Sequence, residues 1–138
     1  MAAACDMRVM AAGTIGLTEV SAGVPFPPAA LEIMRHAAGP ALGELVLTAT
    51  PLDAAAARSA GLIHEVEAPE ALLDSVIARA RTTLRLPAEV FAFSKRQLQR
   101  PARERIAAGA DADAVQAMWE SLPTQEAVTA YLDSLGRR

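Results

Sequence analysis

Apolar residues recur at helical spacing along most of the chain, and the clearest case lies between Pro69 and Pro87. The apolar positions in this stretch are three or four residues apart and share one helix face: Leu72, Leu73, Val76, Ile77, Ala80 and Leu84. Acidic side chains stand near the start of the stretch and arginines near its end, which suits the helix dipole. The pattern therefore predicts an amphipathic helix that stops at Pro87.

Prolines, glycines and one aspartate mark the ends of other helices. A helix is predicted where two prolines open the stretch FPPAALEIMRHAA and Gly39 closes it. A helix of about two turns has Asp53 as its N-cap and ends at Gly61, and residues 62–66 then alternate as in a strand. Three more helices are predicted, over Ala88–Gln99, over Arg103–Trp119 with a break near Gly109, and over Gln125–Leu135.

The first 25 residues follow a different pattern. In CDMRVMAAGTIGL, Cys5, Met7 and Val9 alternate with polar residues, which predicts a strand, a turn at Gly13 and a second short strand. No internal repeat and no low-complexity linker interrupts the chain. The fold class is therefore α/β and helix-rich, in one domain.

Composition excludes several classes of function. With 138 residues and 52% hydrophobic content the chain can build one core, and a net charge of −3 without a basic cluster argues against nucleic acid. The longest uncharged run, Val20–Leu31, contains a glycine and three prolines and is too short to cross a bilayer. A single cysteine, Cys5, excludes an internal disulfide, so we expect a cytoplasmic protein.

One carboxylate stands out by its setting. Glu19 lies in AAGTIGLTEVSAGVPFPP among glycines, prolines and aliphatic residues, and the nearest other charged residues are Arg8 and Glu32. An apolar setting suits a carboxyl that must both accept and donate a proton. The alternatives are that Glu19 is a solvated loop residue or forms an ion pair with Arg8.

Four blocks of sequence together resemble a known family. They are, in chain order, AACDMRV, GLTEVSAGV, ALGELVLTATPLDAAAARSAGLIHEVEAPEALL and LPAEVFAFSKRQL. Their order and spacing resemble the second half of enoyl-CoA hydratase/isomerase (crotonase) family proteins. The resemblance implies one partial crotonase-like domain over residues 1–138. Residues 1–86 would form the end of the family's spiral core, which is built of strand-strand-helix turns. Residues 87–138 would form a helical oligomerisation region.

The resemblance also implies a site. Glu19 would move a proton on an acyl-coenzyme A thioester, which is the substrate, and no separate cofactor is expected. Where many members have Pro-Gly-x-Gly-Gly, this chain has Val24, Pro25 and Phe26, which would line the acyl pocket. Tyr131 would face the coenzyme of a neighbouring subunit, as would the terminal arginines Arg137 and Arg138 unless these form a solvated tail.

The family's chemistry needs more than one carboxylate. In the family, two backbone N–H groups stabilise the thioester oxygen, and the resemblance places both outside this sequence, as it does the first glutamate of the hydratases. We therefore expect the chain as given to be incomplete and nearly inactive, with isomerisation favoured over hydration. The alternative is a non-catalytic remnant that associates with itself or with paralogues; in either case a homo-oligomer, trimer or hexamer, is expected.

Other reactive residues point to structural roles. His36 and His64 are too far apart in sequence to form a zinc pair by themselves, and no metal site is expected. Cys5 and Trp119 are interpreted as packing residues. Lys95 either approaches a coenzyme phosphate or lies on a solvated helix face.

Overall fold

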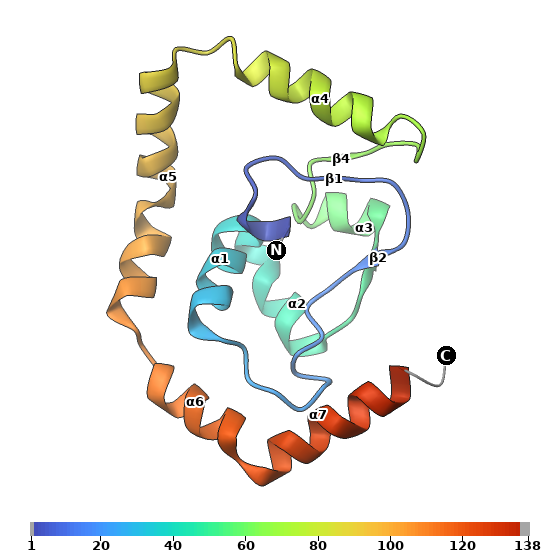
Figure 1. Cartoon of the computed structure of the whole chain (residues 1–138), viewed down its shortest axis with the longest axis vertical. Helices are drawn as coiled ribbons and strands as arrows, with labels where there is room; N and C mark the ends of the chain where they lie inside the picture. Colours follow the sequence, from blue (N-terminus) through green and yellow to red (C-terminus); the bar gives the residue numbers. More distant parts are fainter. Residues whose placement is uncertain (1, 136–138) are drawn as a thin grey trace.

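The computed structural model describes residues 2–135, which form an inner group of short elements and an outer arc of helices (Figure 1). The inner group contains α1 (Pro28–Ala38), α2 (Leu42–Thr48) and α3 (Ala54–Ser59), with one-turn 3₁₀ helices at Ala2–Ala4 and Gly39–Ala41. The arc consists of α4 (Leu72–Thr83), α5 (Ala88–Ala108), α6 (Ala112–Glu120) and α7 (Leu122–Leu135). The helix-rich α/β class predicted from the sequence is confirmed.

Two short ladders tie distant segments together. Strand β1 (Val9–Met10) pairs in parallel with β4 (Glu65–Val66), and β2 (Thr14–Ile15) pairs antiparallel with β3 (Leu52–Asp53). The two predicted N-terminal strands thus join different ladders. The prediction that the first strand includes Cys5 and Met7 is wrong, because β1 starts only at Val9.

The helix-glycine-strand block folds as its residues predict. Asp53 caps α3 by accepting a hydrogen bond at Oδ1 from the N–H of Ala56, at 2.8 Å. At the other end Gly61 has φ +76°, and the N–H of Leu62 donates to the carbonyl of Ala57 at 2.9 Å. Because residues 62 and 63 complete this helix end, the strand predicted over 62–66 is reduced to β4.

The core lies where α1, α2 and α3 meet the segment that follows β2. Its buried side chains are Leu17, Met34, Ala38, Leu42, Leu45, Ala57, Leu62 and Ile63. Gly16 permits this packing, since a Cβ there would lie 2.9 Å from the backbone Cα of Pro51. This contact fixes the backbone three residues before Glu19.

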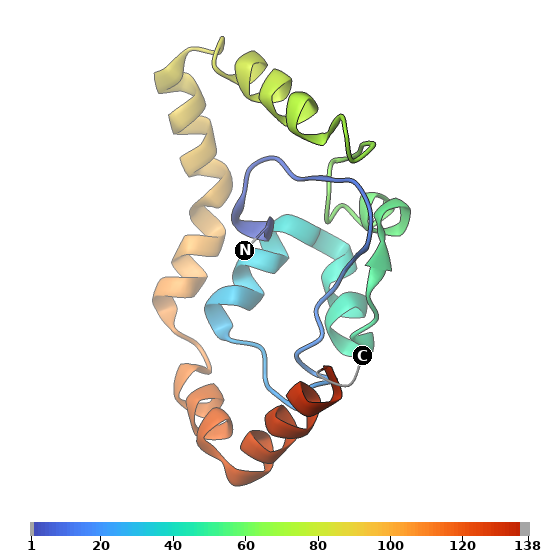
Figure 2. The ribbon, with the colours of Figure 1, turned by 45° about the vertical axis from the view of Figure 1, so that its right-hand side comes forward.

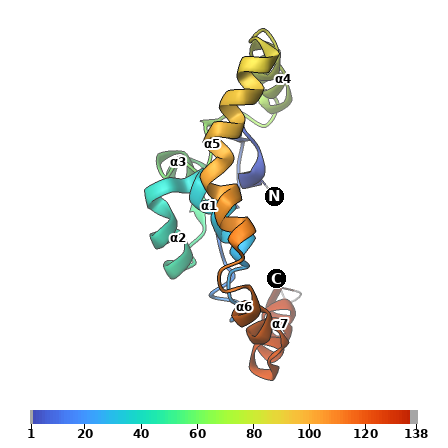
Figure 3. The ribbon, with the colours of Figure 1, turned by 90° about the vertical axis from the view of Figure 1, so that its left-hand side faces the viewer.

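Helix α5 is longer than predicted, and α4 is more exposed. A break was expected after Gln99, yet α5 continues through Pro101 to Ala108 and ends at Gly109, at the expected glycine. Its packing across α1 (Figure 3) stabilises it despite the lost hydrogen bond, with Ala102 buried and Arg105 paired with Glu32. The predicted helix before Pro87 is confirmed as α4, but no α4 residue is buried among the described residues.

Candidate functional site

Glu19 begins a tight turn, residues 19–23, which we call the Glu19 turn. The N–H of Ala22 donates to the carbonyl of Thr18 at 3.0 Å, and the N–H of Gly23 donates to that of Val20 at 3.1 Å. The N–H of Val24 closes the turn on the carbonyl of Glu19 at 3.0 Å. The backbone of Glu19 is therefore held by hydrogen bonds within its own turn.

The carboxyl group of Glu19 is partly withdrawn from solvent. Its residue is half-buried, and its Oε2 atom is buried without a hydrogen-bond partner among the described residues. The aliphatic side chains of Leu17 and Val24, on either side of the turn, are buried. A buried carboxyl oxygen without a partner is costly for stability, which makes Glu19 a candidate for a binding or catalytic residue.

Arg8 is occupied elsewhere, which argues against an ion pair with Glu19. Its guanidinium donates to the backbone carbonyls of Leu62 at 2.6 Å, Cys5 at 3.0 Å, Gly61 at 3.3 Å and Ala37 at 3.4 Å. Burial lowers the pKa of Arg8, while the charge of Cys5 acts in the opposite direction. Arg8 thus joins the N-terminal segment to the ends of α1 and α3.

The three residues predicted to line an acyl pocket follow the turn in a segment without regular secondary structure before α1. Val24 is buried, and Pro25 and Phe26 are half-buried. Phe26 packs against the hydrophobic core. At least one of the three therefore has a structural role as well.

Helix α7 lies against the Glu19 turn of the same chain (Figures 1 and 2). Gly23 has φ +75°, and a Cβ at this position would lie 2.6 Å from the Cβ of Ala127. Tyr131 is half-buried one turn further along the same face of α7. The structure thus brings the face of Tyr131 to the turn of its own chain, whereas Arg137 and Arg138 lie outside the described residues.

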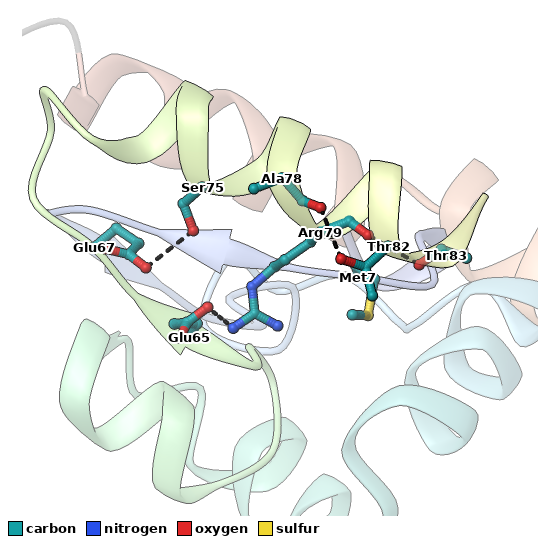
Figure 4. Close-up of a pocket in the computed structure, with 8 residues that line it drawn as sticks. All are labelled: Met7, Glu65, Glu67, Ser75, Ala78, Arg79, Thr82 and Thr83. Carbon is teal, nitrogen blue, oxygen red and sulfur yellow. Dashed lines mark hydrogen bonds and ion pairs between the residues drawn. The ribbon is translucent and has the colours of Figure 1, made fainter. Parts of the chain in front are cut away.

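A groove lies under α4, away from the Glu19 turn (Figure 4). Its polar side chains are paired with one another: Arg79 with Glu65, and the hydroxyl of Ser75 with Oε1 of Glu67 at 3.0 Å. Thr82 and Thr83 donate to carbonyls of α4 itself. Since these polar groups already have partners, the groove is a weaker candidate than the Glu19 turn.

The remaining residues singled out in the sequence have these surroundings. Lys95 forms an ion pair with Asp6, so its head group is held at the N-terminal segment. Cys5 is exposed, so its interpretation as a buried packing residue is wrong, and Trp119, at 39% exposed, also lies at the surface of the described chain. Within residues 2–135, no three His, Cys, Asp or Glu side chains are grouped closely enough to hold a metal ion.

His64 has a specific partner that the sequence does not indicate. The backbone N–H of Arg8 donates to Nδ1 of His64 at 3.0 Å, and the N–H of His64 donates to the carbonyl of Arg8 at 2.8 Å. Burial, followed by the charges of Arg8 and Arg79, lowers the pKa of His64. The imidazole of His64 thus accepts the hydrogen bond from the N–H of Arg8 that a backbone carbonyl would otherwise accept, one residue before β1.

Two features of the site have no signal in the sequence. The contact between Gly23 and Ala127 joins residues more than a hundred positions apart, and small residues at both positions are common in helices and turns. The hydrogen bond between Arg8 and His64 also depends on the parallel pairing of β1 and β4.

Among the described helices, none is long and apolar enough to cross a membrane.

Comparison with known proteins gives consistent matches. The family model for enoyl-CoA hydratase/isomerase matches residues 1–136. A protein named "Probable enoyl-CoA hydratase echA17" from Mycobacterium avium (strain 104) is 35% identical over 115 residues, which are 79% of this chain and 45% of that protein. This chain therefore belongs to the enoyl-CoA hydratase/isomerase family.

Solved structures share the fold. Human mitochondrial Δ3-Δ2-enoyl-CoA isomerase superposes with a TM-score of 0.86 at 21% identity, covering 96% of this chain and 54% of that one. An apo enoyl-CoA isomerase of Mycobacterium tuberculosis superposes with a TM-score of 0.76 at 30% identity, covering 84% and 51%. The chain spans about half the length of the relatives it matches.

Proposed function

We propose that this chain supplies the proton-transfer carboxylate, Glu19, of an acyl-CoA enzyme of the enoyl-CoA hydratase/isomerase type. The observation that carries the proposal is the buried Oε2 atom of Glu19, which has no partner among the described residues. A general base needs an oxygen that no protein donor occupies, and the Oε2 of Glu19 accepts no hydrogen bond from the described residues, while the turn around it is hydrogen-bonded. Family membership supports the substrate class, a coenzyme A thioester.

The chemistry would use Glu19 twice. As a carboxylate it removes a proton from the carbon next to the thioester carbonyl, and the electron pair shifts toward the carbonyl oxygen to give an enolate. As a carboxylic acid it returns that proton at another carbon of the same acyl chain, which moves the double bond. General acid–base help of this kind contributes about 10²–10⁴-fold in rate. Isomerisation is favoured over hydration because one carboxylate serves it, whereas hydration in the family uses two.

The enolate oxygen would also need hydrogen-bond donors. Each such donor contributes about 10²–10³-fold, and the family resemblance assigns both to segments other than those in this sequence. We therefore propose that the 138 residues by themselves turn over enoyl-CoA thioesters slowly, and that they do so at full rate only with the remaining elements of the fold. In the active enzyme, Val24, Pro25 and Phe26 would line the acyl chain and Tyr131 would approach the coenzyme.

Substitution of Glu19 tests the proposal. Glu19→Gln keeps the shape of the side chain but removes the base, and Glu44→Gln, at an exposed position of α2, is the control. Both variants are assayed on 2-enoyl-CoA and 3-enoyl-CoA thioesters. The assays are made with the 138-residue chain and with any longer protein that the same reading frame encodes from upstream of the Met1 codon. We expect loss of turnover by about 10²–10⁴-fold in Glu19→Gln alone. Turnover that survives Glu19→Gln would refute the assignment.

A non-catalytic role is the second candidate, and exposed apolar surface on α5 favours it. Leu98 is 69% exposed, Val90 63% and Phe93 55%, and exposed apolar surface of this kind marks association sites. In this alternative, residues 87–138 act as an oligomerisation region that joins copies of the chain, or paralogues, as a trimer or hexamer. Absence of turnover in every form, with a stable oligomer present, would favour it.

The proposal carries two further expectations. Residues 1–138 would fold as one domain, with residues 1–86 closing the spiral core of the family fold. A reducing compartment, the cytoplasm, is proposed because the chain has one cysteine, Cys5, and its thiol is exposed.

A further inference from the structure

The Glu19 turn and α7 meet without space for a methyl group. A Cβ added to Gly23 would lie 2.6 Å from the Cβ of Ala127, which is closer than real Cβ atoms approach one another. Gly23 also has φ +75°, a conformation that glycine adopts without the steric cost a side chain incurs. The backbone of the turn and the side chain of Ala127 are thus in direct contact.

The face of α7 that contains Ala127 is withdrawn from solvent along two helical turns. Thr124 is 6% exposed, and Ala127, Val128 and Tyr131 are half-buried at the spacing i, i+3, i+4 and i+7. Among the other residues of α7 whose exposure is described, those between Leu122 and Ser134 are exposed. Helix α7 therefore has one buried face, and Ala127, at the middle of that face, contacts the Glu19 turn.

A displacement of Gly23 would be transmitted to Glu19 through short covalent and hydrogen-bonded paths. The N–H of Gly23 is bonded to the carbonyl of Val20, and the N–H of Val24 is bonded to the carbonyl of Glu19 itself. On the other side, the contact of Gly16 with Pro51 holds the backbone that enters the turn. The turn is thus fixed at its entrance by the β2–β3 ladder and at its exit by α7.

We propose that α7 of the same chain positions the Glu19 carboxylate, and that Gly23 and Ala127 are the positioning residues. The inference rests on the proposed role of Glu19 but adds an element to that role. Misplacement of a catalytic group by about 1 Å can lower a rate about 10²-fold. Loss of the contact should therefore lower kcat more than it raises KM.

A double-mutant cycle isolates the contact. Gly23→Ala introduces both backbone strain and the clash with Ala127, whereas Gly23→Ala with Ala127→Gly introduces the strain alone. Ala127→Gly also weakens the helix, so exposed Ala130→Gly in the same helix is the matched control. Each variant is made in the whole chain, and amide hydrogen exchange at Ala22, Gly23 and Val24 is measured by NMR.

We expect Gly23→Ala to accelerate exchange at these three amides by about tenfold, because overpacking displaces the turn. Ala127→Gly should slow exchange again in the Gly23→Ala background, to the level that the backbone strain alone allows, whereas Ala130→Gly should not. Equal exchange in the Gly23→Ala variant with and without Ala127→Gly would overturn the proposal, since the contact would then have no energetic effect on the turn.

Kinetics of the same variants separates positioning from simple stability. In the form of the protein whose turnover depends on Glu19, kcat should fall in Gly23→Ala and recover with Ala127→Gly, while KM changes less. A fall that appears only in KM, or that Ala130→Gly reverses equally well, would contradict positioning. If Glu19→Gln leaves turnover intact, the proposed function fails, but the exchange cycle still decides whether α7 holds the turn.

Discussion

Arg8 stabilises the inner part of the molecule through one planar guanidinium. It donates to backbone carbonyls of Cys5, Ala37, Gly61 and Leu62, which belong to three separate segments. A guanidinium has several donors in a fixed plane, and the single ammonium of lysine cannot reach the same acceptors together. A charged side chain with so many backbone acceptors serves the fold and is not available to neutralise Glu19.

We therefore predict that Arg8→Lys destabilises the fold by about 1.5–3 kcal/mol, as expected for the loss of hydrogen bonds from a charged group. The free energy of unfolding in urea measures the effect. Arg100→Lys is the control, because the side chain of Arg100 is 71% exposed. Similar stability of the two variants would show that the four acceptors are satisfied without Arg8.

His64 gives the fold a predicted pH dependence. Burial and the charges of Arg8 and Arg79 lower its pKa from the usual 6.5, so the folded chain favours neutral imidazole and the unfolded chain binds the proton more readily. The resulting stability is present above pH 6.5 and is lost as pH falls through the lowered pKa of the folded state. His64→Asn offers an acceptor to the Arg8 N–H without titrating.

Urea unfolding from about two pH units below to about one unit above the usual histidine pKa of 6.5 checks this prediction. The stability of the His64→Asn variant should fall less with acid than that of the wild type. His36→Asn, which replaces an exposed histidine, should follow the wild-type curve. A parallel fall in wild type and His64→Asn would assign the acid sensitivity to other groups.

At the scale of elements, α3 is short and depends on its ends. It has six residues, too few to be stable alone, and Asp53 satisfies one of its first free N–H groups at Ala56. Asp53→Ala should lower the free energy of unfolding by about 1 kcal/mol. Asp53→Asn keeps the acceptor and should cost much less. Equal losses in both variants, in thermal or urea unfolding, would show that the charge rather than the cap matters.

Helices α4 and α5 show how an amphipathic pattern can form a helix without burying it. Both form where the sequence predicts helix, yet α4 has no buried residue among those described, and α5 buries only Ala102. The ion pairs of α5 with Asp6 and Glu32 fix its place beside the inner group. The apolar side chains that remain exposed at the corner of the two helices include Leu84, Leu86, Val90, Phe91 and Phe93.

At the scale of the whole molecule, this exposed surface predicts self-association. Clustered apolar side chains of this extent are covered by a partner in stable proteins, so the chain should sediment as an oligomer at micromolar concentration. Val90→Glu with Phe93→Lys should shift it toward the monomer, because charges would then be buried at the contact. Leu47→Lys, on α2 away from this corner, is the control. A wild-type monomer without binding of an apolar dye would contradict the prediction.

The sequence by itself determined the local structure and the family. Proline and glycine positions set the ends of α1 and α3, because φ restrictions and capping act within a few residues. Helical periodicity located α4, and the four sequence blocks indicated the family that the comparisons confirm. Glu19 could be selected as a candidate because it is a lone charge in an apolar stretch.

Only the tertiary structure decided which distant segments meet. Packing on α1 carries α5 through Pro101, against the local preference to stop there, and only Val9 and Met10, which pair with β4, form the first strand. The Glu19 oxygen that has no partner within residues 2–135, and the contact between Gly23 and Ala127, arise from tertiary packing that no local pattern records. Such approaches depend on the summed packing of the whole chain, in which contacts distant in sequence outweigh small differences in local propensity.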